Sequence, residues 1–444
     1  MSLKTPTGPL DIPVAASTPA PASIPGVSEE SPPSKGLLIN RNFALLAIGQ
    51  AISNIGDFVY APTLLVWVFV LTHSAGAVSG VWIAEYAPVF LLGPIAGVFV
   101  DRWNRRTTMI VADILRAMIA LLPLFAPGSL RLPAIYTSIF LISGLARFFM
   151  PAKSGVLQVI VSQKQQPQAA SISQATFALS FIVGPAIASP LYFVVGPTVA
   201  LTINAATFVV SALSLAAMRV SKEALHPYAA KGVEHSSEGL RGVLRELAAG
   251  YLFVVKTRVL LMIVFLGLIA MLGAGALNAL DIIFVNQNLH VSASLYGPLI
   301  AVGGVGTLLG AIIAGFATKK LTPKYLLVGG VFFTGVGIMV YSFLTWYPLA
   351  LVVNFLIGIP QAAINIGFGP LLLGVTPQTM MGRVQSVIET AMFGISLVSI
   401  GLAGYFGQFV PVSIIFLVSG VLIVLSGIFG WFSLPATASQ EAVK

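Results

Sequence analysis

Seven charged residues lie inside long apolar stretches of the sequence, where a charge needs a specific reason. They are Asp57, Glu85, Asp113, Arg116, Arg147, Asp281 and Glu389. An Asp, Lys or Arg at the centre of a membrane-spanning helix costs about 2.5–3.5 kcal/mol on insertion scales, so such residues usually face a partner or a water-filled cavity. These positions are therefore the first candidates for mechanism.

Four of the acids are candidates for proton coupling, namely Asp57 and Glu85 in the first half of the chain and Asp281 and Glu389 in the second. A carboxyl group in an apolar environment favours its neutral form, which lets it bind and release a proton. The second pair could oppose the first across a cavity. Cation binding or helix packing is the alternative role for these acids, and a solvated acid at the rim is an equal alternative for Asp281.

Asp113, Arg116 and Arg147 favour a structural charge network instead. Asp113 and Arg116 are three residues apart and share one helix face, which permits a local ion pair. All three lie towards the expected cytoplasmic ends of their helices. We therefore expect them to stabilise the protein near a charged loop that is described below.

The elements that must position these residues follow from the composition. The 444 residues include 23 Lys and Arg but only 14 Asp and Glu, and 57% of the residues are hydrophobic. A soluble protein carries about 25% charged residues, a far larger share than in this chain. A soluble multidomain enzyme is therefore excluded. The absence of Cys excludes disulfides and thiol catalysis.

Apolar runs long enough to cross a bilayer of about 30 Å recur along the chain, and runs of this length are helical. The sequence therefore predicts an all-α membrane protein with twelve transmembrane helices in two pseudo-symmetric six-helix bundles. The expected spans are residues 42–71, 78–100, 107–126, 132–152, 170–193, 197–218, 259–285, 296–317, 325–344, 348–372, 384–406 and 411–433.

The basic residues predict the orientation of these spans. Alternate loops and both tails hold 20 of the 23 Lys and Arg, whereas the opposite set of loops holds only Arg131. By the positive-inside rule, both termini are cytoplasmic in a multi-pass protein of the plasma membrane or inner membrane. A basic soluble face for nucleic-acid binding is missing, so no nucleic-acid partner is expected.

The chain is expected to divide into two bundles with polar segments around them. The segments are a Pro- and Ser-rich disordered tail (1–36), an N-terminal bundle (37–219), a central loop (220–258), a C-terminal bundle (259–433) and a short tail (434–444). In the central loop, apolar residues between Leu240 and Leu247 share one helix face, which predicts an interfacial amphipathic helix.

The loop between the second and third spans has the most specific motif. It reads Gly97-Val-Phe-Val-Asp101-Arg102-Trp103-Asn104-Arg105-Arg106. This pattern resembles the signature loop of the major facilitator superfamily. The resemblance implies alternating access, with Gly97, Asp101, Arg102, Arg105 and Arg106 as a latch that breaks when the two bundles rock. The matching position in the second half, near Lys319, lacks the acid, so a latch is not expected there.

Shorter motifs resemble the macrolide-efflux and enterobactin-exporter branch of that superfamily. Examples are Ser53-Asn-Ile-Gly56-Asp57, the segment from Arg147 to Pro151 and the pair Gly184-Pro185. The resemblance implies proton-coupled export of an amphipathic small molecule such as a macrolide-like drug or a siderophore. Ile187-Ala-Ser-Pro190 departs from the Gly-Gly that antiporters often carry after Gly-Pro.

The tenth span supplies candidate substrate contacts in Gln361 and Asn365, which share a helix face beside helix-loosening prolines. Ordinary helix packing is the alternative. No P-loop and no metal-ligand spacing of His occur in the sequence, so no cofactor and no metal are expected. Clustered catalytic residues are also missing, so an enzyme is not expected.

We therefore expect a secondary transporter that acts as a monomer on a small-molecule substrate and protons within the lipid bilayer. The sequence leaves two other transport functions open, a proton symporter that imports a nutrient and a transporter of lysophospholipid.

Overall fold

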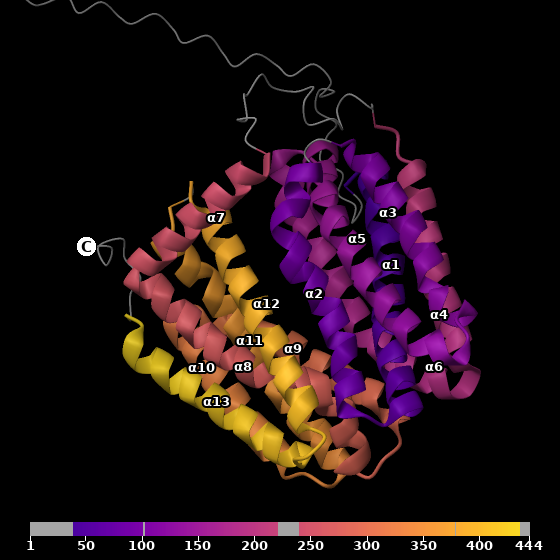
Figure 1. Cartoon of the computed structure of the whole chain (residues 1–444). Coiled ribbons are helices and arrows are strands. Elements are labelled where there is room, and N and C mark those ends of the chain that lie inside the picture. Colours follow the sequence, from indigo (N-terminus) through magenta and orange to yellow (C-terminus); the bar gives the residue numbers. More distant parts are fainter. Residues whose placement is uncertain (1–38, 101–102, 221–238, 378, 436–444) are drawn as a thin grey trace, which may run out of the picture. The chain divides into compact units, whose positions relative to one another are not determined.

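The computed structural model describes residues 39–100, 103–220, 239–377 and 379–435. These residues form helices joined by short turns, and no strand occurs among them (Figure 1). Eleven helical segments of the described chain are long and apolar enough to cross a membrane. The structure therefore confirms the all-α membrane fold that the apolar runs predict.

The helices before the central loop are called the N-half here. They are α1 (Arg41–Thr72), α2 (Ala75–Val100), α3 (Arg105–Ala120), α4 (Leu122–Phe125), α5 (Arg131–Ile160) and α6 (Gln166–Ala216). The helices that follow α7 (Gly239–Lys256) are called the C-half. They are α8 (Arg258–Gln287), α9 (Tyr296–Ala317), α10 (Pro323–Ser342), α11 (Tyr347–Val375), α12 (Met381–Phe406) and α13 (Val412–Ser433).

Helix α6 contains two of the twelve expected spans, which is why eleven segments are found. Gly196 adopts φ 79° and ψ 173° inside it, a conformation that favours glycine, and Pro197 follows. Residues 166–195 and 197–216 form two arms that both pack against α1. The Phe58 ring lies 5.3 Å from Phe177 of the first arm, and Gln50 Nε2 donates to Ser211 Oγ of the second at 3.2 Å.

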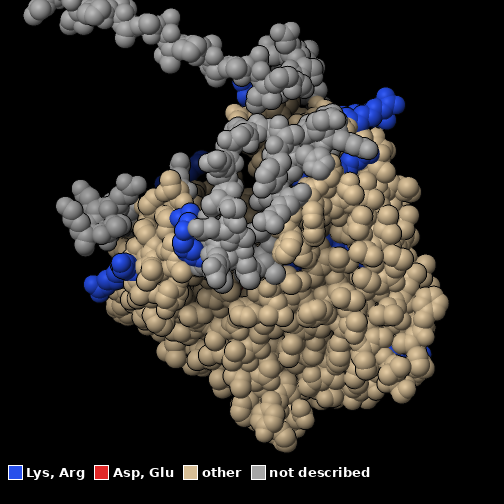
Figure 2. Space-filling view, turned by 45° about the horizontal axis from the view of Figure 1, so that its top comes forward, with Lys and Arg blue, Asp and Glu red and all other residues tan. Residues whose placement is uncertain are grey.

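The turns between α2 and α3, α5 and α6, α9 and α10, and α11 and α12 lie on one side, which we call the basic side. Lys164, Lys319 and Lys320 lie in these turns, and Figure 2 shows blue Lys and Arg side chains around this face. The turns between α1 and α2, α3 and α5, α8 and α9, α10 and α11, and α12 and α13 lie at the other helix ends, which we call the opposite side (Figure 1). Arg131 is placed there, as the sequence predicts.

The buried apolar residues divide differently on the two sides. Towards the opposite side, one cluster contains residues of both halves, including Phe69 and Ile135 together with Phe284 and Tyr296. Towards the basic side, the N-half has its own cluster around Met109, and the C-half has a separate one. Among the described residues, a continuous apolar core therefore joins the halves towards the opposite side and not towards the basic side.

Close helix contacts between the halves also gather towards the opposite side. Gly404 of α12 packs against Ser79 of α2, and Gly297 of α9 packs against the Pro185 carbonyl group of α6. These glycines allow two helix backbones to approach closely, as in other membrane helix pairs. The contacts fix the halves against each other at one end and leave space between them at the other.

Several helices extend beyond the expected apolar spans. Helix α5 continues to Ile160, eight residues past the expected limit of 152, and α6 already begins at Gln166. Helix α7 covers the segment for which an amphipathic helix is expected, and its Gly250 lies against the Arg383 carbonyl group near the start of α12. Hydropathy detects only the apolar part of a helix, so polar extensions are missed.

Two glycines of α9 predict opposite effects of the same substitution. A Cβ atom at Gly306 would collide with the Phe355 carbonyl oxygen of α11, whereas nothing lies within 4 Å of a Cβ atom at Gly315. Gly306→Ala should lower the free energy of unfolding by about 1–3 kcal/mol through overpacking. Gly315→Ala should raise it by about 0.5–1 kcal/mol through helix propensity. Thermal unfolding of the purified variants checks this, and equal stability of the two would contradict the packing.

Candidate transport cavity between the two halves

A cavity of about 260 Å³ lies between the halves on the basic side of their close contacts. Helices α2 and α5 of the N-half and α12 of the C-half line it. The lining residues are Val89, Gly93, Arg147, Met150, Pro151, Ser386, Glu389, Thr390 and Phe393. Two of the seven charged residues singled out in the sequence, Arg147 and Glu389, therefore meet at one cavity.

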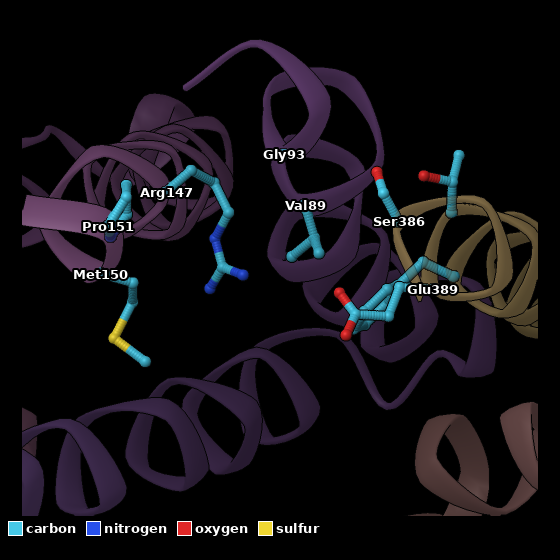
Figure 3. A pocket seen from close by; sticks show the side chains of 9 residues that line it. Val89, Gly93, Arg147, Met150, Pro151, Ser386 and Glu389 are labelled. Carbon is cyan, nitrogen blue, oxygen red and sulfur yellow. The ribbon is translucent and has the colours of Figure 1, made fainter. Parts of the chain in front are cut away.

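Figure 3 shows the charged ends of Arg147 and Glu389 directed into the same space from α5 and α12. Arg147 Nε is buried and has no hydrogen-bond partner among the described residues. The Arg147 guanidinium interacts electrostatically with Glu85 and with Glu389. The Glu389 side chain is exposed, and its Oε1 atom accepts a hydrogen bond from Gln385 Nε2 at 2.9 Å.

Aromatic rings separate the cavity from the close contacts between α2 and α12. The Phe393 ring lies 5.5 Å from the Tyr86 ring in an edge-on arrangement, and Tyr86 lies 5.7 Å from Trp82 in the same way. Phe90 packs beside Gly394. Edge-on aromatic pairs fill space with specific geometry, so these rings form a wall across the interface of the two halves.

A second group of charges is buried within the N-half. Arg116 Nη1 and Asp113 Oδ1 are 3.4 Å apart, and the two side chains are 6% and 0% exposed. The Arg116 guanidinium also lies over the rings of Phe149 and Phe208, at 4.7 and 5.6 Å from their centres. Asp57 of α1 lies close enough to interact electrostatically with this pair. The sequence predicts a charge network of this pair with Arg147; the structure directs the Arg147 guanidinium into the cavity, where it still interacts electrostatically with Arg116.

Asp281 lies in a different environment from Glu389. Its Oδ1 atom accepts a hydrogen bond from the Tyr341 hydroxyl group at 3.0 Å, and the Tyr341 ring lies 4.7 Å from Phe284. These residues belong to the part of the C-half that joins the shared apolar cluster. Asp281 and Glu389 therefore lie in separate parts of the C-half, and of these two acids only Glu389 lines the cavity.

The signature loop is only partly described. Asp101 and Arg102 lie outside the described residues, and Gly97 is within α2. Arg105 Nη1 donates to the Gly155 carbonyl group at 3.4 Å, and Arg106 donates to the carbonyl groups of Leu215 (2.8 Å) and Ala216 at the end of α6. Both described arginines thus bind carbonyl groups of their own half, and opening of a latch stays a prediction.

Gln361 and Asn365 lie on α11, outside the residues that line the cavity. Sequence reasoning missed Met150, Ser386, Thr390 and Phe393 as lining residues. A signal for three of them was present, because Ser386 and Phe393 lie three and four residues from Glu389 on one helix face, and Thr390 lies four residues after Ser386.

The buried Asp113–Arg116 pair predicts a strong coupling between two substitutions. Asp113→Asn removes the ion-pair partner of the buried Arg116 and should lower the free energy of unfolding by about 3–5 kcal/mol. Adding Arg116→Gln removes the uncompensated charge and should recover part of that loss. Unfolding of the two single variants and the double variant measures this, and additive losses would contradict an energetically coupled pair.

Comparisons with known proteins agree with this architecture. The chain is 26% identical over 415 residues to the MFS-type transporter YkuC of Bacillus subtilis, covering 90% of this chain and 94% of that protein. It is 23% identical over 404 residues to macrolide efflux protein A of Streptococcus pyogenes, covering 86% and 93%. The crystal structure of the nucleoside transporter NupG superposes with a TM-score of 0.72 at 14% identity, covering 89% of this chain and all of that one.

The family described as transmembrane secretion effector matches residues 36–444. This match covers every described residue of the chain, including both halves and the cavity between them. The protein therefore belongs to this family, in the efflux branch of the major facilitator superfamily of membrane transporters.

Proposed function

We propose that the protein is a proton-coupled exporter of amphipathic small molecules that works by alternating access. One observation carries the proposal. The halves share an apolar core towards the opposite side but have separate cores and a jointly lined cavity towards the basic side. Rocking of two halves around a central site is the usual basis of alternating access in transporters with repeated halves. This conformation corresponds to the state that is open towards the basic side.

The acids next to the buried arginines support proton coupling. Glu85 interacts electrostatically with Arg147, and Asp57 does so with Arg116. Protonation would neutralise either acid and remove its attraction on the neighbouring guanidinium. A proton on Glu85 would therefore change the charge that a ligand meets at Arg147, which is a direct way to link proton binding to ligand binding.

The direction of transport is supported by the relatives rather than by the cavity itself. Macrolide efflux protein A is named as an exporter and aligns with most of this chain. With the basic side in the cytoplasm, the observed cavity would take up its ligand from the cell interior. Import of a nutrient by proton symport and movement of lysophospholipid are the competing functions, and the direction of accumulation separates export from import.

The function is tested in cells that lack the protein and in cells that express it. Export predicts that loss of the protein raises the accumulation of a lipophilic cationic dye or of a macrolide, and that a protonophore removes the difference. Lower accumulation in the deletion strain would overturn export. A vesicle assay with a fluorescent lysophospholipid examines the remaining alternative.

Asp57→Asn and Glu85→Gln should each abolish uphill transport if the acid carries the coupled proton. Either variant should retain exchange of labelled substrate across vesicles at equal concentrations, because that reaction needs no net proton movement. Reduction of uphill transport by at least about tenfold, with exchange retained, is the expected result. Lys164→Gln, in an exposed turn on the basic side, is the matched control. A variant that still drives uphill transport with unchanged pH dependence would remove that acid from the proton path.

A further inference from the structure

Arg147 interacts electrostatically with Glu85 and Glu389 but forms no close ion pair with a described residue. Its Nε atom is buried without a hydrogen bond, and no carboxylate among the described residues lies within ion-pair distance of its guanidinium. A guanidinium group stays charged at physiological pH and offers five N–H donors. Leaving the buried Nε donor without a partner is costly. An anionic group brought by a ligand would accept from Nε and a second guanidinium donor in a bidentate arrangement.

Glu389 offers the opposite charge from the other half. Its side chain is exposed, and the hydrogen bond from Gln385 engages only Oε1. Figure 3 shows this carboxylate directed towards the space that the Arg147 guanidinium also enters. A ligand in the cavity thus meets a positive group on the N-half and a negative group on the C-half.

The rest of the lining combines apolar side chains with the hydroxyl groups of Ser386 and Thr390, and its volume suits a compact ligand. Val89, Met150 and Phe393 line the same space. Met and aromatic side chains form adaptable apolar walls. The volume of about 260 Å³ lies just below the ~300–1,000 Å³ of common small-molecule sites. These walls suit a small apolar body between two charged ends.

From this arrangement we infer that the cavity binds a small amphipathic zwitterion. The anionic group of the ligand would contact Arg147, its ammonium group would contact Glu389, and its apolar body would pack on Phe393 and Met150. A ligand with only a cation would leave Arg147 unsatisfied, and a ligand with only an anion would leave Glu389 facing it. The inference rests on the proposed transport function and names the class of substrate for the same cavity.

The placement of the two charges also connects the ligand to the movement of the halves. Arg147 belongs to α5 of the N-half, and Glu389 belongs to α12 of the C-half. A ligand that carries both charges contacts both halves at once, whereas a ligand with one charge engages one half. A zwitterion would therefore favour closure of the cavity more strongly than either of its singly charged derivatives.

The inference is tested with three forms of one probe, the dipeptide phenylalanyl-alanine. Its methyl ester lacks the carboxylate, and its N-acetyl derivative lacks the ammonium group. Binding to the purified full-length protein is measured by calorimetry. The dipeptide should bind about 10- to 100-fold more tightly than either derivative, as expected for loss of one charged contact.

Variants assign each preference to its residue. Arg147→Gln should bind the dipeptide and its methyl ester equally, and Glu389→Gln should bind the dipeptide and its N-acetyl derivative equally. Arg147→Lys keeps a positive charge and should retain part of the preference for the free acid. Arg131→Gln, on the same helix at the opposite side and beside Trp67, is the control and should bind like the unaltered protein. Thermal unfolding verifies that each variant is folded.

The outcomes separate this inference from the proposed function. If the three probe forms bind equally, or if a lipophilic cation binds and the dipeptide does not, the zwitterion class is wrong. A preference for the dipeptide that persists in Arg147→Gln would overturn the assignment to Arg147. If the dipeptide binds as described but vesicles do not transport it, the export function fails while the ligand class stands.

Discussion

A charge inside a membrane-spanning helix must find a partner or water, and this constraint determines where the protein can carry chemistry. Arg116 meets it with Asp113 and two aromatic rings inside the N-half. Asp281 meets it with the Tyr341 hydroxyl group. Arg147 and Glu389 face the cavity and form no close ion pair among the described residues, although Arg147 interacts electrostatically with Glu85 and Glu389. These two charges are therefore the ones that a ligand can reach.

The cavity itself results from how the apolar core is divided. One cluster joins the halves towards the opposite side, while the clusters around Met109 and around Val328 remain within their own halves towards the basic side. Close glycine contacts such as Gly404 with Ser79 reinforce the joined end. Closer packing of the halves on the basic side would separate these contacts on the opposite side. The same sequence can therefore support two arrangements of the halves.

The helical fold could be predicted from the sequence because apolar runs of about 20 residues have few alternatives in a membrane. Pairing between distant segments could not be predicted. The sequence marks Arg147 and Asp113 as charged positions on separate helices, and only the packing of α2 against both α5 and α12 brings Arg147 to the same cavity as Glu389. Lining residues such as Met150 were missed because an apolar residue on a lipid-facing helix surface looks the same in one sequence.

The central claim is that the two halves alternate between an arrangement closed on the opposite side and one closed on the basic side. Distances between spin labels test it directly. The chain contains no Cys, so spin labels attach only to introduced Cys residues. One pair of Cys residues replaces Lys164 and Lys320 on the basic side, and a second pair replaces Ser129 and Gln408 on the opposite side. In vesicles with a pH gradient and the dipeptide probe, we expect a population with a shorter label-to-label distance for the basic-side pair and one with a longer distance for the opposite-side pair. Unchanged distances for both pairs during measured transport would contradict it.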